Sequence, residues 1–358
     1  RKIQNIKEFF NFEKIDDKFN WKNLRIGVVD GSNSRNMSER LGVRYGVYAA
    51  CYQIYEGDKL IEENFFGDYI SQNQIDDPEL ASKVLSFKRF LLEREVALSC
   101  LKDKDLDYLV IDGSFFGYRG DIRPYLEEEE VQINEEFFKV GEIIEDLTKK
   151  TLELLRTNKA LGIIKRSRLS VIDGWLTYKF KSEEYCLNMN DKYILSFLMP
   201  PKSIFTYSSL LEKPYSYYHF SKFRKLFRKY YGKEDIKSIL NRAEKEIKEI
   251  VDILKCPLEE FLSTDRYFVR CSNLSYPFEL EVPKSMFIKP ILVYFLNFYN
   301  EATGLPFLLD LVDESITLPS GFLREFVEEI EAHLVKEALP KEDIFLAFSY
   351  INPQKLED

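Results

Sequence analysis

The sequence predicts an α/β fold in which helices flank a mixed β-sheet. Short apolar runs rich in β-branched residues, such as residues 24–29 and 107–111, predict buried strands. They alternate with longer segments that have helical spacing of apolar residues, at 77–102 and 134–156. Because the chain has 358 residues, it can bury a full core against such a sheet.

The first half of the sheet is predicted to be a three-stranded meander. After the strand that ends at Asp30, residues 44–55 and 59–70 have the composition of two further strands joined by a tight turn. A long helix follows them. Its start is indicated by Asp77, which fits the N-cap, and by Pro78, which fits the first helical position.

The second half adds a strand that ends at Asp112, a helix over 134–156 and a strand over 160–165. The resulting order is strand, strand, strand, helix, strand, helix, strand. This is the order of an RNase H-like sheet. We therefore expect an RNase H-like mixed sheet core flanked by helices, with helical insertions.

The rest of the chain predicts a single domain with two additions. Residues 1–20 are expected to form an N-terminal amphipathic helix that docks on the body or on a partner. Residues 21–358 form the domain, with a helical, basic and aromatic insertion at about 175–265. Later elements are expected as strands at 266–271 and 278–282 and helices at 287–299 and 320–338.

Composition restricts the chemistry to carboxylates. Only two histidines are present, so a histidine metal cage or a Ser-His-Asp triad is nearly excluded. The five cysteines form no C-x-x-C pair, and we expect free thiols in a reducing cytoplasm. The net charge of −9 means that nucleic acid must be bound by a local basic patch. No apolar run is long enough to cross a bilayer, so we expect no membrane contact.

A repeated tripeptide is the main functional signal. Two predicted strands end in the same residues, Asp30-Gly31-Ser32 and Asp112-Gly113-Ser114, in which the glycine would let the chain turn sharply. Strands paired in one sheet would hold the two carboxylates close together. Like charges repel unless a cation lies between them, so the pattern indicates a divalent metal site. Two solvated Asp-Gly turns are the alternative.

A third carboxylate is expected on the first long helix. Its apolar stripe includes Leu91 and Leu98, and Glu95 falls within this stripe, whereas Glu93 falls on the opposite face. A carboxylate on a buried stripe needs a metal ion or a basic partner. The alternative is that Glu95 lies at the edge of the stripe and pairs with Arg94 or another base.

Cations and aromatic rings alternate between residues 215 and 231. This pattern suits a groove for single-stranded nucleic acid, in which bases stack on the rings and phosphates pair with the charges. The alternative is an ordinary amphipathic helix with its phenylalanines inward. The candidate nucleic-acid-binding cations are Lys222, Arg224, Lys225, Arg228 and Lys229.

Together these motifs resemble the NurA nuclease family. The resemblance runs from about residue 24 to 330 and includes Gly162-Ile163-Ile164-Lys165, the segment 190–195 and the Gly-x-Pro-Phe-x-Leu stretch that begins at Gly304. It implies a manganese-dependent deoxyribonuclease, with Mg²⁺ as an alternative ion. Such an enzyme acts as a single-strand endonuclease and a 5′–3′ exonuclease. The resemblance also implies a homodimer that works with a HerA-type hexameric translocase in DNA end resection.

By position, Asp30, Glu95 and Asp112 match the metal-binding acids of this family, and they also occupy the acidic positions of an RNase H-like sheet. The mechanism implied is two-metal phosphodiester hydrolysis, in which Asp30 and Asp112 bridge or flank two ions. Glu95 and Asp313 would complete the shells of these ions.

The fourth ligand departs from the family pattern. Where the family usually has a histidine, this chain has Asp313, and a carboxylate can replace an imidazole as a manganese ligand. Glu314 and Asp310 are alternatives for the same role. Lys165 would lie beside the scissile phosphate as a point charge, or it is a surface lysine at the end of a strand.

Two other functional classes remain open from the sequence. A non-catalytic DNA-binding clamp that serves the translocase would share the same acids without cleaving DNA. An ATPase of the actin and hexokinase type also has an RNase H-like core with an Asp-Gly turn at its first strand. That class requires a duplicated core and a glycine-rich adenosine loop, and the sequence contains neither.

Overall fold

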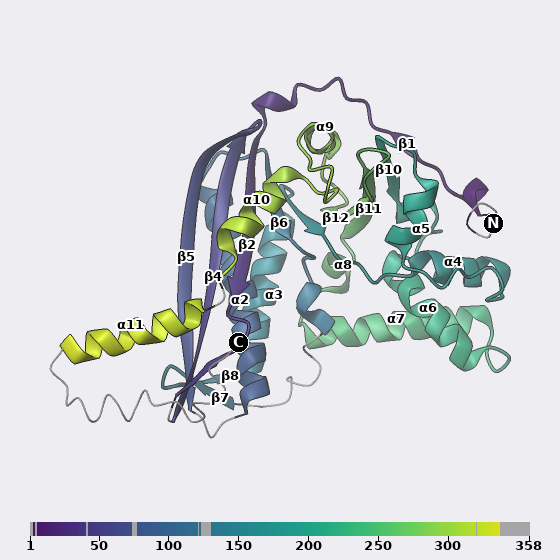
Figure 1. The fold of residues 1–358 in the computed structure, drawn as a ribbon. Coiled ribbons are helices and arrows are strands. Elements are labelled where there is room, and N and C mark those ends of the chain that lie inside the picture. Colours follow the sequence, from purple (N-terminus) through teal and green to yellow (C-terminus); the bar gives the residue numbers. More distant parts are fainter. Residues whose placement is uncertain are drawn as a thin grey trace.

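The computed structural model describes residue 3 and residues 6–40, 42–73, 77–120, 122, 130–319 and 321–336. In these ranges a ten-stranded sheet runs through the molecule in the order β1-β10-β11-β12-β9-β6-β2-β4-β3, and β5 pairs with β4 (Figure 1). Its strands are β1 (Glu13–Lys14), β2 (Arg25–Asn33), β3 (Ser38–Arg40), β4 (Val43–Glu56), β5 (Lys59–Asn73), β6 (Tyr108–Asp112), β9 (Ala160–Ile164), β10 (Ser203–Thr206), β11 (Thr264–Arg270) and β12 (Phe278–Pro283).

Helices cover both faces of this sheet. They are α2 (Pro78–Asp103), α3 (Val140–Arg156), α4 (Val171–Phe180), α5 (Asp191–Leu198), α6 (Tyr217–Tyr230), α7 (Ile236–Ile253), α8 (Leu258–Phe261), α9 (Lys289–Asn297), α10 (Phe307–Ile316) and α11 (Phe322–Lys336). Within the described ranges, none of them is both long and apolar enough to span a bilayer.

Five neighbouring strands confirm the predicted fold class. β2, β4 and β5 form the expected antiparallel meander. β6 pairs parallel to β2, and β9 pairs parallel to β6. Together they give the spatial order β5-β4-β2-β6-β9 of an RNase H-like sheet. β12 continues the sheet on the far side of β9 in the antiparallel sense.

The two faces of β2 and β6 contribute to two different core layers. Val29 and Ile111 belong to the layer that contains α2 and α3, whereas Val28 and Val110 belong to the layer that contains α9 and α10. Figure 1 shows α10 beside β2 and β4, and the group α4 to α7 beside the β10–β12 end of the sheet. Both faces of these strands are covered, which explains why they are almost continuously apolar.

The predicted N-terminal helix is wrong for the described part of that segment. Lys7–Phe9 form a single 3₁₀ turn, and the chain then enters the short strand β1. Ile6 and Phe10 are buried in the main core, and the Phe9 ring lies 5.8 Å from the Trp175 ring. The apolar residues of this segment therefore pack against the core of the protein without forming an α-helix.

The predicted helix over 134–156 begins later than expected. Before α3, the chain forms a separate two-stranded hairpin of β7 (Glu130–Ile133) and β8 (Glu136–Lys139). Asn134 and Glu135 connect these strands with positive φ values of 51° and 67°. A two-residue turn with both φ angles positive matches the twist of a hairpin, so the helix cannot include these residues.

Candidate metal centre

Three aspartates from three different elements meet at one edge of the sheet. Asp30, Asp112 and Asp313 each offer a carboxylate oxygen, and these oxygens all lie within 4.8 Å of one another. Asp30 and Asp112 lie side by side on neighbouring strands, because β2 and β6 are parallel and Val29 pairs with Ile111. Asp313 comes from α10, which packs over β2 (Figure 1). The pairing of the two Asp-Gly-Ser strands therefore brings their carboxylates together, as the sequence predicted.

The two glycines that follow these aspartates have different roles. Gly113 has a φ of +103°, so the predicted sharp turn is confirmed at the end of β6. The same prediction is wrong at Gly31, because β2 continues without a turn to Asn33. A Cβ atom on Gly31 would lie 2.6 Å from Glu93 Oε1, so this position needs glycine to make room for a side chain of α2.

Glu93, and not Glu95, faces the sheet from α2. Glu93 is 2% exposed, and its carboxylate accepts hydrogen bonds from Arg89 at 2.5 Å and Arg94 at 3.4 Å. Glu95 is exposed to solvent. The predicted orientation of the helix is therefore wrong, and Arg94 pairs with Glu93 instead of with Glu95.

The physical reason is that small and charged residues form much of the buried face of α2. Glu93 shares this face with Val96, Ala97 and Cys100, which lie three, four and seven positions further along the helix. Leu91 and Leu98, which defined the predicted stripe, are only partly buried. The predicted stripe, which was based on large apolar side chains, therefore does not coincide with the buried face of this part of α2.

The cluster concentrates negative charge in a buried place. The pKa of Asp30 is raised to about 8, first because it is buried and then because the charges of Asp112 and Glu93 lie nearby. Burial also raises the pKa of Asp112, although Lys165 acts to lower it. The pKa of Glu93 is likewise raised by burial, against the effect of Arg89 and Arg94. Such crowding of hard oxygen donors fits a divalent cation.

Lys165 joins the cluster from the end of β9. Its Nζ lies 2.8 Å from Asp112 Oδ2 and 3.1 Å from Asp313 Oδ2. Burial acts to lower the pKa of Lys165, but the two carboxylates outweigh it and raise this pKa, so the ammonium group stays charged. Lys165 is thus placed within the candidate centre and is not an isolated surface lysine.

Asp313 is the acid of α10 that meets the other two aspartates. Asp310 instead accepts hydrogen bonds from Asn300 and Thr303, each at 2.8 Å. Among the described residues, neither Asp310 nor Glu314 belongs to the aspartate cluster. Of the three alternatives that the sequence left open, only Asp313 is placed to share a cation with Asp30.

A buried network that the sequence analysis missed supports the turn after Asp112. Ser114 Oγ donates a hydrogen bond to Glu281 Oε2 at 2.5 Å, and Phe115 N donates to the same oxygen at 3.0 Å. Arg266 pairs with this oxygen at 3.2 Å and with Glu279 at 2.7 Å. The available signal was the alternation of Glu279 and Glu281 with apolar residues in one strand, which places both acids on one face.

The cations predicted on α6 are largely engaged by acids. Arg224 lies 2.8 Å from Asp173 and 2.9 Å from Glu183. Arg228 also pairs with Glu183 at 2.6 Å, and Lys222 lies 3.7 Å from Glu246. Phe223 and Phe227 point into the core, while Lys225 and Lys229 are exposed. Arg224 therefore holds α4 and α6 together, and nucleic-acid binding by the α6 cations stays a prediction.

Comparisons with known proteins agree with this architecture. The crystal structure of the NurA nuclease from Sulfolobus solfataricus is similar, with a TM-score of 0.54, 15% sequence identity and coverage of 94% of this chain and 92% of that chain. A crystal structure of NurA with manganese has a TM-score of 0.51, 11% identity and coverage of 96% of this chain and 94% of that chain. A search of curated protein sequences finds no match. The family model for the NurA domain matches residues 24–314, so the chain belongs to the NurA family.

Proposed function

We propose that this protein is a metal-dependent deoxyribonuclease that hydrolyses phosphodiester bonds at the acidic cluster. The observation that carries the proposal is the convergence of Asp30, Asp112 and Asp313 within 4.8 Å. Buried Glu93 lies beside them, against Gly31. Membership of the NurA family supports the same reading, since the similar Sulfolobus solfataricus protein is named a nuclease.

The residues present fit a divalent ion. All four acids offer hard carboxylate oxygens, which suit Mn²⁺ and Mg²⁺. The pKa of Asp30 is raised to about 8 by burial and by neighbouring charges, and a bound cation would remove this repulsion. A similar crystal structure is described as NurA with manganese, so Mn²⁺ is the preferred ion and Mg²⁺ the alternative. Asp30, Glu93, Asp112 and Asp313 would hold two ions per active site.

The reaction adds water across one P–O bond. The water oxygen bonds to phosphorus, the bond to the leaving oxygen breaks, and one water proton ends on the leaving oxygen while the other stays with the new phosphate monoester or solvent. When bound, two divalent ions would lower the pKa of the attacking water and stabilise the leaving oxygen. Lys165 Nζ would pair with a non-bridging oxygen of the phosphate, a role supported by its distance of 2.8 Å from Asp112.

The substrate and partners follow from the family resemblance. The protein would act on DNA ends and single strands, as a single-strand endonuclease and a 5′–3′ exonuclease. It would work as a homodimer with a HerA-type hexameric translocase in end resection. Exposed residues of the N-terminal segment 1–20 are proposed to contact the translocase.

The direct test is cleavage of a labelled single strand and a labelled duplex with Mn²⁺, with Mg²⁺ and with a chelator. We expect cleavage with either ion and none with chelator. Asp30→Asn and Asp112→Asn should each retain at most a few per cent of the activity, because each removes a charge from the shared site. Far-UV circular dichroism checks that both variants fold. Substantial activity in either folded variant would refute the two-carboxylate centre.

The same assay distinguishes a nuclease from the two other functional classes, a DNA-binding clamp and an ATPase. A protein that binds Mn²⁺ and DNA without cleaving the strand would be a clamp. A protein that hydrolyses ATP under these conditions and leaves DNA intact would belong to the ATPase class. Either result overturns the nuclease proposal.

A further inference from the structure

A stretch of the chain that begins at the candidate centre is rich in cations. Lys165, Arg166 and Arg168 follow directly on β9, and Lys165 Nζ is 2.8 Å from Asp112. Arg166 and Arg168 are exposed, and within the described ranges neither of them forms an ion pair. Three residues span at most about 10 Å even when fully extended, so this run keeps positive charge within a short distance of the acids.

Helix α5 lies against this run and adds a fourth cation. Lys192 Nζ donates a hydrogen bond to the Lys165 carbonyl at 3.2 Å, and Asp191 N donates to the Leu169 carbonyl at 3.0 Å. The Asp191 carboxylate accepts from Val171 N at 2.7 Å, which ties α5 to the start of α4. The first turn of α5 is therefore fixed beside the basic run.

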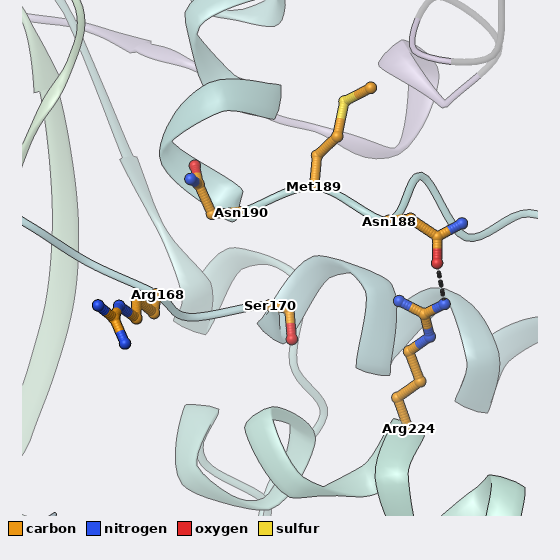
Figure 2. Close-up of a pocket in the computed structure, with 6 residues that line it drawn as sticks. All are labelled: Arg168, Ser170, Asn188, Met189, Asn190 and Arg224. Carbon is orange, nitrogen blue, oxygen red and sulfur yellow. Dashed lines mark hydrogen bonds between the residues drawn. The ribbon is translucent and has the colours of Figure 1, made fainter.

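The far end of the run opens into a hollow of about 320 Å³. Figure 2 shows Arg168 on the segment that leads to Ser170, whereas Met189 and Asn190, which line the same hollow, lie on the loop that leads into α5. Arg224 also lines it, but its guanidinium group is held by Asn188 (dashed line in Figure 2) and by Asp173. Arg168 is thus the cation of this hollow whose charge is not engaged within the described ranges.

Two aromatic rings are exposed on α5, the helix whose N-cap residue Asn190 lines this hollow. Tyr193 and Phe197 are 43% and 55% exposed, and their ring centroids are 5.0 Å apart in an edge-to-face arrangement. They lie on the same side of the helix as Asn190, since positions three and seven residues apart share a face. Exposed rings on a helix that contacts a run of unengaged cations form the combination on which single-stranded bases stack.

We propose that five residues on and beside α5 bind the single strand that enters the candidate centre. We call them the α5 track, and they are Arg166, Arg168, Lys192, Tyr193 and Phe197. Its cations pair with phosphates, and its rings stack on bases. The ligand is single-stranded DNA, because the charge is complementary to phosphate and the track is continuous with the acidic cluster through Lys165. The proposal rests on the proposed nuclease function.

The test measures DNA affinity without cleavage. A fluorescein-labelled oligonucleotide of single-stranded DNA is titrated with the full chain carrying Asp30→Asn, in chelator. Adding Arg166→Ala with Arg168→Ala should weaken binding at least about tenfold, and should reduce the slope of log affinity against log salt by about 1.4, since each phosphate contact on a single strand contributes about 0.7. Adding Tyr193→Ala with Phe197→Ala should weaken binding about tenfold and leave that slope unchanged.

Two further double variants serve as comparisons. Lys233→Ala with Lys237→Ala removes the same charge from exposed positions just before and within the first turn of α7, and should leave the affinity within about twofold. Lys225→Ala with Lys229→Ala tests the exposed cations of α6. If the α6 variant weakens binding more than the Arg166 and Arg168 variant does, the strand runs over α6 and the α5 track is refuted.

The outcomes separate this proposal from the proposed function. Unchanged affinity in both track variants overturns the track, even if Asp30→Asn abolishes cleavage as expected. Weakened affinity in the track variants supports the track, even if the unsubstituted protein proves unable to cleave DNA. If the track variants keep DNA affinity but lose binding to a HerA-type translocase, the rings form a protein contact and the proposal is wrong.

Discussion

Glu93 fills the space that a side chain on Gly31 would need, since a Cβ atom there would lie 2.6 Å from Glu93 Oε1 and 3.0 Å from the Ala49 carbonyl. Gly31→Ala is therefore expected to displace Glu93 from Asp30 and to lower nuclease activity at least about tenfold, a barrier increase of about 1.4 kcal/mol. The control is Gly67→Ala, because a Cβ atom at Gly67 meets nothing closer than 3.6 Å. Equal activity of the two variants would show that the Gly31–Glu93 contact does not matter for the site.

The two acids of α2 should behave oppositely. Glu93→Gln is expected to abolish cleavage and weaken Mn²⁺ binding, because Glu93 is buried beside the aspartates. Glu95→Gln should behave nearly as wild type, because Glu95 is exposed. Parallel nuclease assays and calorimetric Mn²⁺ titrations measure both effects. Loss of activity in Glu95→Gln alone would restore the orientation that the sequence suggested.

Asp313 is expected to tolerate a change of ligand type but not its loss. Asp313→Ala should lower activity strongly, because it removes one of the clustered oxygens. Asp313→His should retain a measurable part of the activity, since an imidazole can also bind manganese. Cleavage rates over a range of Mn²⁺ concentrations test this, because a lost ligand shifts the concentration needed for half-maximal rate. Asp310→Ala is the control, and equal loss in it would argue against Asp313.

The metal-free protein should become less stable as pH rises. Its Asp30 has a pKa raised from 3.8 to about 8, so the folded state holds a proton that the unfolded chain releases. The stability contributed by this proton is complete below about pH 4 and is lost as pH rises toward about 8. Thermal melts in chelator should therefore show a falling Tm across this window.

Asp30→Asn should remove part of that fall and raise the metal-free Tm near pH 8. For a chain of this size, relief of about 1 kcal/mol corresponds to roughly 2 °C. Added Mn²⁺ should raise the Tm of the wild type more than that of the variant, because a ligand stabilises only the state that binds it. A lower metal-free Tm for Asp30→Asn at pH 8 would contradict the repulsion that we infer.

The N-terminal segment is expected to serve both stability and docking. Ile6, Phe10 and Ile15 are buried, so deleting residues 1–18 should destabilise the protein by several kcal/mol, at about 1.5–3 kcal/mol for each large apolar side chain. Docking is better tested with Lys18→Glu and Phe19→Ala, which change exposed residues. These variants should keep the Tm and weaken binding to a HerA-type translocase. An unchanged affinity in a titration would place the docking surface elsewhere.

The local pattern of the chain was enough to predict the sheet and two of its acids. The apolar runs before Asp30 and Asp112 form neighbouring parallel strands, and the order of elements gives the RNase H-like arrangement. Both features follow from short-range rules, because burial on both faces requires continuous apolar strands and the connections fix which strands are neighbours. The same reasoning failed at Gly31, where a side chain from α2 and not a turn requires glycine.

Tertiary packing decided the rest of the site. Periodicity shows which residues of a helix share a face, but it does not show which face meets the sheet, and so the choice between Glu93 and Glu95 required α2 to be docked. Likewise, Arg224 pairs with Asp173 and Glu183, which are distant in the sequence. The local sequence pattern had suggested that the charge of Arg224 was free to bind nucleic acid. By itself the sequence determined which strands pair and where their aspartates meet. Only the tertiary structure decided which distant charges neutralise one another, because pairing across space depends on how whole elements pack.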